Sequence, residues 1–188
     1  MSLNRVLVGL LLLGGVFALG FVLGSARSNW EPGSGRANLW RLGKPLLIVT
    51  GVFVLAIQVI PYGRAHANPP VEAEPAWSSP EAREFAVRAC FDCHSNETEW
   101  PWYSNIAPVS WLVQRDVEQG RAKANWSEWG ADPDDESSES AETVIDGSMP
   151  PSFFTLIHPE ARLTDAEVDA LVAGLEETFG SSEDRGGD

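Results

Sequence analysis

Two long runs of apolar residues open the chain. Residues 6–26 form 21 consecutive uncharged positions, and residues 45–63 form 19 more. Each run is long enough to cross a hydrocarbon core of roughly 30 Å at about 1.5 Å per residue. The pattern therefore predicts two transmembrane helices, over about 6–26 and 45–62.

The charges beside these runs predict an orientation. Residues 25–44 carry four basic side chains, whereas the N-terminal tail carries only Arg5. Since basic loops stay in the cytoplasm, residues after Tyr62 should lie on the outer side of the membrane. The first run can also be read as a signal peptide cleaved near Ser25-Ala26. In that case the rest of the chain would face inward.

Downstream of residue 62 the pattern changes to short helical periods. Residues 63–79 are rich in proline without apolar periodicity, which predicts a semi-extended tether. A helix should begin at Pro80 and run into the cysteines, and another should run from about Ser110 to Gly120. Thr164, with glutamate three residues later, predicts a capping box at the start of the last helix. We expect a domain over 80–180 and a disordered tail over 181–188.

The charge of the chain is strongly asymmetric. The formal net charge is −14, yet residues 1–62 hold five basic residues and one acidic residue, while the remainder holds 8 basic and 26 acidic residues. Six of those acids fall in residues 131–142, where no base occurs. Such a surface excludes nucleic acid as a partner, because its binding needs clustered Lys and Arg. It favours a basic partner, or serves mainly for solubility.

The two cysteines of the chain form a C-x-x-C-H motif: Cys90, Cys93 and the adjacent His94. This spacing is typical of covalent c-type haem attachment, in which both thiols bond the porphyrin and the histidine binds iron. A structural zinc site is an alternative, but it needs about four ligands. A redox disulfide is another, although the expected strand–helix alternation is missing. A chance occurrence stays open as well.

A second axial ligand for iron is expected at Met149, in the sequence "DGSMPPS". Gly147 permits a tight bend, and the two prolines after Met149 stiffen the backbone. A thioether on such a loop can reach iron from the face opposite His94. The alternative is an ordinary buried methionine, with His158 as the substitute ligand.

Aromatic residues follow the motif closely and are expected to pack against a haem. They are Trp100, Trp102, Tyr103 and Trp111, in a run that also holds several aliphatic residues. Dense aromatic groups bury large apolar areas. Trp102 or Tyr103 is predicted to donate a hydrogen bond to a haem propionate. Pro108 is predicted to supply the carbonyl that accepts from the His94 ring.

The runs "CFDCHSNETEWPWYSNIAPVSW" and "SMPPSFFTLIHPEARLTDAEVDALV" resemble the bacterial membrane-anchored haem-binding domain family, which is related to class I cytochromes c. The resemblance covers roughly residues 70–179. It implies an all-α, cytochrome c-like domain of about four helices, with haem c on Cys90 and Cys93, His94 as proximal ligand and Met149 as distal ligand. The additional N-terminal apolar run and the acidic insert depart from the family pattern.

We therefore expect a membrane-tethered mono-haem cytochrome that carries electrons and is not an enzyme. Its partners would be the lipid bilayer and a redox protein, such as a quinol-oxidising complex, an oxidase or another cytochrome. The haem domain would lie on the periplasmic or extracellular side of the cytoplasmic membrane. The alternatives are a haem-based sensor or peroxidase-like enzyme with a displaceable Met149, and a structural haem subunit of a membrane complex.

Overall fold

The computed structural model describes residues 20, 24, 35–133 and 135–180. The chain divides into two compact units. One comprises Met1–Ala65 with Trp102–Leu112, and the other comprises His66–Pro101 with Val113–Asp188. The predicted boundaries of the anchor, tether and haem domain at residues 62, 79 and 180 stay predictions. The division into two compact units does not test them.

The first unit is built on helix α2, Gly35–Ile57. Ile57 and Ile60 are buried where the helix ends. The side chain of Gln58 pairs with the backbone of Ala107, donating through Nε2 to the carbonyl at 2.9 Å and accepting from the amide at 3.0 Å. A 3₁₀ helix, η1 (Trp102–Asn105), precedes this contact. Residues 58–60 are therefore folded onto protein.

The prediction of two transmembrane helices is wrong. Within the described residues, no helix combines the length and the apolar character that crossing a membrane requires. The apolar part of α2, residues 45–57, covers only about 20 Å at the helical rise, less than the roughly 30 Å of a hydrocarbon core. The sequence pattern counted residues 58–62 as part of the span, but the helix has ended there. The other predicted span, 6–26, lies outside the described residues except for Gly20 and Gly24.

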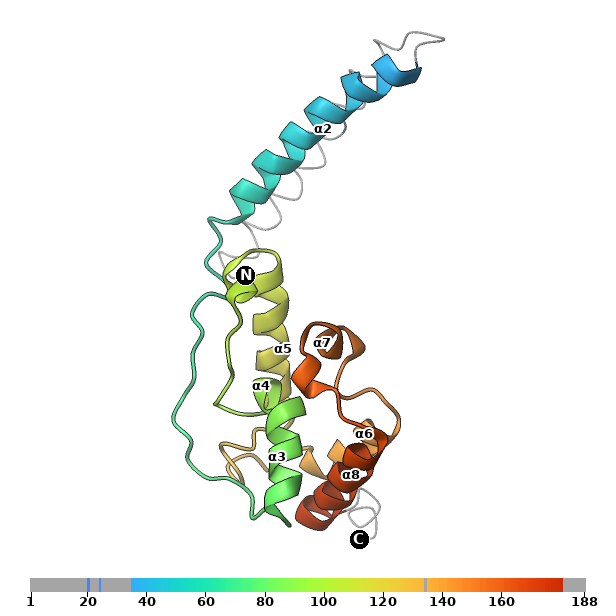
Figure 1. Ribbon diagram of the computed structural model, residues 1–188. Helices are drawn as coiled ribbons and strands as arrows, with labels where there is room; N and C mark the ends of the chain where they lie inside the picture. The colour runs from blue at the N-terminus through green and yellow to red at the C-terminus, as the bar shows by residue number, and fades with distance from the viewer. Residues whose placement is uncertain (1–19, 21–23, 25–34, 134, 181–188) are drawn as a thin grey trace. The chain divides into compact units, whose positions relative to one another are not determined.

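The second unit is helical, as Figure 1 shows. Its α-helices are α3 (Pro80–Ala89), α4 (Phe91–His94), most of α5 (Val109–Lys123), α6 (Ser140–Ile145), α7 (Ser152–Ile157) and α8 (Asp165–Phe179). The 3₁₀ helices are η2 (Ser137–Glu139) and η3 (Pro159–Ala161). The predicted all-α character holds across the described chain, where the only β pairing is an isolated bridge between Ala73 and Glu128. The domain has more and shorter helices than the four predicted, because the segment between α5 and α8 folds into single turns.

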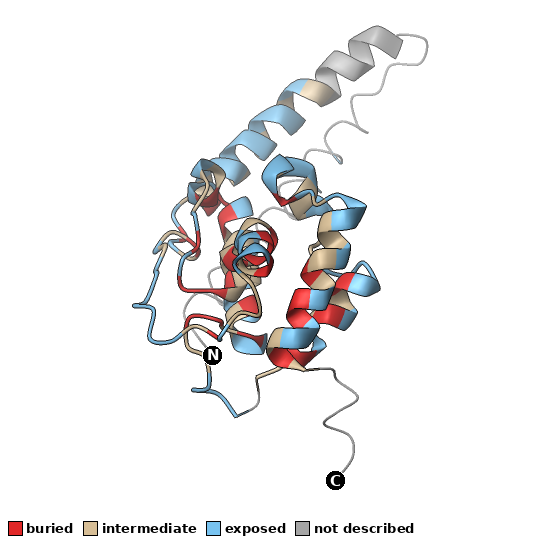
Figure 2. Ribbon diagram, turned by 60° about the horizontal axis from the view of Figure 1, so that its bottom comes forward, coloured by how far each residue is buried: buried red, intermediate tan, exposed pale blue. Residues whose placement is uncertain are grey.

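Helices α3 and α8 pack side by side at the centre of this unit (Figure 1). Ser79 caps α3 by accepting from the Ala82 amide. A Cβ added to Gly174 of α8 would come within 2.3 Å of the Ala82 Cβ, so only glycine allows this close approach. Figure 2 shows buried and exposed residues interleaved along α3 and α8, so each of these two helices has an inner side.

An aromatic cluster fills the core beside this contact. Trp126 lies at its centre, with ring centroids 5.3 Å from Trp77, 5.9 Å from Phe91 and 5.6 Å from Phe179. The core aromatics thus come from four separate segments, and not from the aromatic run after the motif. Trp126 also donates from Nε1 to the Ser137 hydroxyl at 3.0 Å, which holds the acidic insert onto the core.

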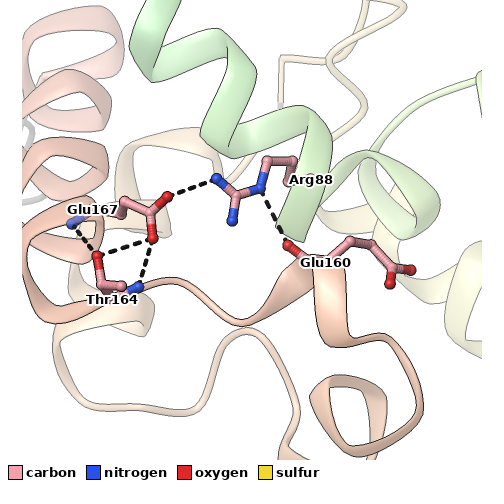
Figure 3. Close-up of polar contacts among 4 residues, drawn as sticks. All are labelled: Arg88, Glu160, Thr164 and Glu167. Atoms are coloured by element: carbon pink, nitrogen blue, oxygen red, sulfur yellow. Dashed lines mark hydrogen bonds and ion pairs between the residues drawn. The ribbon is translucent and has the colours of Figure 1, made fainter.

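A polar link joins α3 to the start of α8 (Figure 3). Arg88 forms an ion pair with Glu167, 2.7 Å between Nη1 and Oε1, and donates to the Glu160 carbonyl at 3.1 Å. Glu167 and Thr164 form the predicted capping box. The Thr164 amide and Arg88 lower the pKa of the Glu167 carboxyl to about 2.

Candidate functional site

The C-x-x-C-H motif forms a tight helical turn. Helix α3 ends at Ala89, Cys90 lies between the helices, and α4 carries Cys93 and His94. The Cys90 carbonyl accepts from the amides of Cys93 at 3.0 Å and His94 at 2.9 Å. Residues three apart in such a turn lie on the same side. The turn thus presents both thiols together with the imidazole next to them.

The two cysteines are free thiols in half-buried positions. Desolvation by burial is the main cause that raises the pKa of each thiol to about 12. Redox-active C-x-x-C pairs need the opposite, a thiol pKa lowered towards neutrality. The raised pKa of both thiols therefore argues against a dithiol that exchanges electrons itself.

His94 is held in one orientation by the loop after α5. Its ring Nδ1 lies 3.1 Å from the Ala124 carbonyl oxygen. Because a carbonyl can only accept, Nδ1 carries the proton, and Nε2 keeps the lone pair that a metal needs. Burial lowers the pKa of the ring, which favours this neutral form. The carbonyl partner is thus Ala124, and not Pro108 as the sequence predicted.

Trp126 adds two further restraints on His94. Its indole stacks on the imidazole with centroids 5.6 Å apart and an interplanar angle of 28°. Its backbone amide donates to the His94 carbonyl at 2.9 Å. Together with the Ala124 contact, these interactions fix the ring and the backbone of His94 before any ligand binds.

The residues after His94 form a buried polar network. The Ser95 hydroxyl donates to the Phe91 carbonyl at 2.8 Å, and Thr98 donates to the Asp92 carbonyl at 2.8 Å. The Asn96 amide donates to the Ser127 hydroxyl at 2.9 Å. Buried polar groups contribute stability only when they are paired. This pairing explains why the motif continues as Ser-Asn-Glu-Thr.

Helix α5 packs directly on the motif through Gly120. A Cβ at this position would lie 2.4 Å from the carbonyl oxygen of Cys93, closer than real Cβ contacts. The sequence was interpreted as ending a helix at Gly120, but α5 continues to Lys123. Glycine is required here for a close approach of two backbones.

Met149 lies on the loop between α6 and α7, in the same compact unit as His94. Its amide donates to the Thr143 carbonyl at 2.9 Å, and the residue is 39% exposed. Large exposed apolar residues cluster along this part of the chain: Ile145, Phe153, Leu156 and Ile157. Exposed apolar surface of this kind marks a place where another apolar group binds. This is consistent with Met149 facing a large apolar cofactor.

Trp102, Tyr103 and Pro108 belong to the first unit. The rings of Trp102 and Tyr103 meet edge to face with centroids 5.9 Å apart, and Trp102 is 77% exposed. The structure therefore does not place them with the cysteines in one compact unit. The predicted contact of Trp102 or Tyr103 with a haem propionate stays a prediction.

His158, the substitute ligand, has partners of its own. Its Nδ1 lies 2.8 Å from a Glu160 carboxylate oxygen, and its ring stacks on Phe154 with centroids 4.3 Å apart. Across the described ranges, no three His, Cys, Asp or Glu side chains gather into a group that could hold a metal ion.

Sequence reasoning missed the residues that orient His94. Arg121 donates to the Ser95 carbonyl at 2.8 Å, Ala124 accepts from the ring, and Trp126 stacks on it. All three lie about 30 residues after the motif. The only local hint in the sequence is a glycine followed by an arginine, Gly120-Arg121, near the end of a predicted helix. The same pair is equally typical of an ordinary helix C-terminus.

Comparison with known proteins identifies a family for most of the chain. Residues 52–177 match the model of a family described as a haem-binding domain, which is more than half of the chain. No curated protein and no solved structure matches.

Proposed function

This chain belongs to the haem-binding domain family, and on that premise we propose that it is a mono-haem c-type cytochrome that carries electrons. The observation that carries the proposal is the orientation of His94. Its Nδ1 is engaged by the Ala124 carbonyl within a C-x-x-C-H turn, which leaves Nε2 for iron. A cytochrome needs this arrangement in its proximal ligand.

Two kinds of residue would hold the cofactor: cysteines that bond the porphyrin and side chains that bind the iron. Cys90 and Cys93 would attach the porphyrin through thioethers, His94 would bind the iron on one face, and Met149 would bind it on the other. A haem bound in this way supplies a one-electron redox centre whose potential is raised by the methionine sulfur. The exposed apolar residues Phe153, Leu156 and Ile157 would shield one side of the site from water. No proton-transferring group is required, so the proposal includes no enzymatic step.

The setting of the protein follows from this chemistry. Covalent haem attachment takes place outside the cytoplasmic membrane, so we place the domain on the periplasmic or extracellular side. The acidic surface after residue 62 favours a basic redox partner. A quinol-oxidising complex, an oxidase or another cytochrome would meet this requirement.

Electron exchange tests the proposed role. The haem-loaded protein, in its reduced form, should reduce a basic soluble c-type cytochrome with second-order kinetics measured by stopped-flow absorbance. The rate should fall as salt is raised from 10 to about 200 mM, because exposed charges are then screened. A haem that stays reduced in the presence of this acceptor would contradict the carrier role and support a purely structural haem.

The exposure of Met149 favours one second candidate, a ligand-binding haem protein. A sulfur donor that is 39% exposed on a loop of exposed residues could be displaced by a diatomic gas or by peroxide. Carbon monoxide added to the reduced protein at neutral pH separates the two functions. Rapid formation of a new Soret band would support the sensor or peroxidase-like reading, and an unchanged spectrum would support the carrier.

A further inference from the structure

Arg121, in the last turn of α5, joins three segments of the chain with its guanidinium. Nε donates to the Ser95 carbonyl at 2.8 Å, and Nη1 donates to the Ala67 carbonyl at 3.1 Å. Nη2 donates to Asn68 Oδ1 at 3.1 Å and to Thr98 Oγ1 at 3.0 Å. The side chain thus ties the segment at residues 67–68 to the segment directly after His94.

The partners of Arg121 differ from those of Arg83 and Arg88. Arg83 and Arg88 each bond a carboxylate, of Glu74 and Glu167 respectively. Arg121 forms no ion pair within the described part of the chain, and its four hydrogen bonds all go to neutral oxygens. Its positive charge is therefore not cancelled by direct contact with an acid.

This charge lies next to the haem-attachment motif. Burial lowers the pKa of the Arg121 guanidinium, but arginine stays protonated in proteins. Gly120, the residue before Arg121, lies against the Cys93 carbonyl, and the Arg121 guanidinium itself reaches the Ser95 carbonyl. A fixed cation in a partly desolvated position acts more strongly on a nearby redox centre than one in water.

Most of the donors of Arg121 are already used by the protein. A guanidinium has five N–H groups, and four of them reach protein oxygens here. Hydrogen bonds within the protein therefore fix the Arg121 side chain, and few of its donors are left to bind a carboxylate of the cofactor. One of its hydrogen bonds goes to the backbone carbonyl of Ser95, one residue beyond His94.

We propose that Arg121 is a positioning residue for the iron ligand: it fixes the backbone after His94 and keeps a positive charge beside Cys93, which raises the reduction potential of the bound haem. This proposal rests on the proposed function. The hydrogen bonds orient the imidazole through the Ser95 peptide. The charge disfavours the oxidised iron, which is the more positive of the two states.

Three variants of the haem-loaded protein test the two parts separately. Arg121→Gln removes the charge and most of the hydrogen bonds, whereas Arg121→Lys keeps the charge and loses the planar fork. Arg115→Gln is the matched control, because it removes the same charge from an exposed position of the same helix. The midpoint potential by redox titration and the electron paramagnetic resonance spectrum of the oxidised protein are measured for each.

At the wild-type midpoint potential, the oxidised-to-reduced ratio should rise at least about threefold in Arg121→Gln and stay nearly unchanged in Arg115→Gln. Arg121→Lys should keep a potential near wild type, but its resonance spectrum should shift, as in Arg121→Gln, because the Ser95 carbonyl no longer restrains the backbone after His94.

A potential and spectrum in Arg121→Gln that equal those of Arg115→Gln would overturn the proposal. If Arg121→Gln does not fold, the resonance spectrum of Arg121→Lys decides. A spectrum equal to that of the wild type overturns the positioning role, and a shifted spectrum supports it. A wild-type protein that purifies without haem after co-expression with a maturation system refutes the proposed function instead, so the two failures are distinguishable.

Discussion

The two regions expected to contact iron differ in how they are built. Around His94, the side chains of Ser95, Thr98 and Trp126 are buried and hydrogen-bonded. Around Met149, the large apolar residues of the loop and of α7 are exposed. The His94 region is stabilised by contacts within the chain itself. The Met149 region exposes apolar surface that no described part of the chain covers. Binding of an apolar cofactor there would therefore stabilise this region more than the His94 region.

This difference assigns separate roles to the two regions. A preorganised ligand loses little freedom when it binds, and its orientation is set by the protein. A ligand on an exposed loop gains its order from the bound group. The His94 region should therefore determine folding and ligand orientation, while the Met149 region should respond to the state of the cofactor.

The largest contrast is expected between two aromatic truncations. Trp126→Ala should lower the free energy of unfolding by about 3–5 kcal/mol, because it removes a buried ring at the centre of the core. Phe153→Ala should cost less than about 1 kcal/mol, because this ring is 60% exposed. Denaturant unfolding of both variants before haem is attached measures this difference. Equal losses would show that the Met149 region is as tightly packed as the His94 region.

Close packing at Gly120 should give the next largest effect. Gly120→Ala places a Cβ against the Cys93 carbonyl and should destabilise the protein by about 1–3 kcal/mol. The control is Gly51→Ala in α2, where nothing lies within 4 Å of an added Cβ and stability should not fall. Thermal unfolding followed by circular dichroism compares the two. A Gly120→Ala variant as stable as the control would refute the close contact.

A pair of isosteric threonine variants tests the polar network. Thr98→Val removes hydrogen bonds to Arg121 and Asp92 and should cost about 1–2 kcal/mol, since it leaves buried partners unpaired. Thr155→Val on α7 removes only a local bond to Ser152 and should cost about 0.5 kcal/mol or less. The midpoints of urea unfolding report both values. The contrast fails if the Thr155 variant loses as much stability as the Thr98 variant.

The smallest effect concerns the link between α3 and α8. The pKa of Glu167 is lowered to about 2 in the folded chain, so its ionised form is favoured by folding. The resulting stability is present above the ordinary glutamate pKa near 4.5 and is lost as the pH falls towards 2. Glu167→Gln should remove this part of the acid sensitivity. Unfolding midpoints between pH 5 and 2 for both proteins give the comparison, and parallel curves would contradict it.

Sequence patterns predicted the local features of this fold well. The helix start at Pro80, the capping box at Thr164 and the motif at Cys90–His94 each depend on a few adjacent residues. Such features are set by short-range geometry, which a sequence shows directly.

Features that depend on distant residues could not be predicted in this way. The carbonyl of Ala124 reaches His94 across 30 positions, and nothing in its side chain marks it. The apolar run at residues 45–62 satisfied a length rule for membrane helices, yet Gln58 pairs with Ala107 and the helix ends before it. The length of an apolar run shows that the segment is hydrophobic. It does not show whether lipid or another part of the protein covers that segment, which depends on tertiary folding.

Peptide mass spectrometry tests the central claim most directly. Trypsin cutting after Arg88 and Arg115 releases one peptide that contains Cys90, Cys93 and His94. After maturation and full denaturation, this peptide should carry the mass of one haem, and the Cys90→Ala, Cys93→Ala double variant should carry none. A peptide with free thiols, or with the two cysteines joined to each other, would contradict the account.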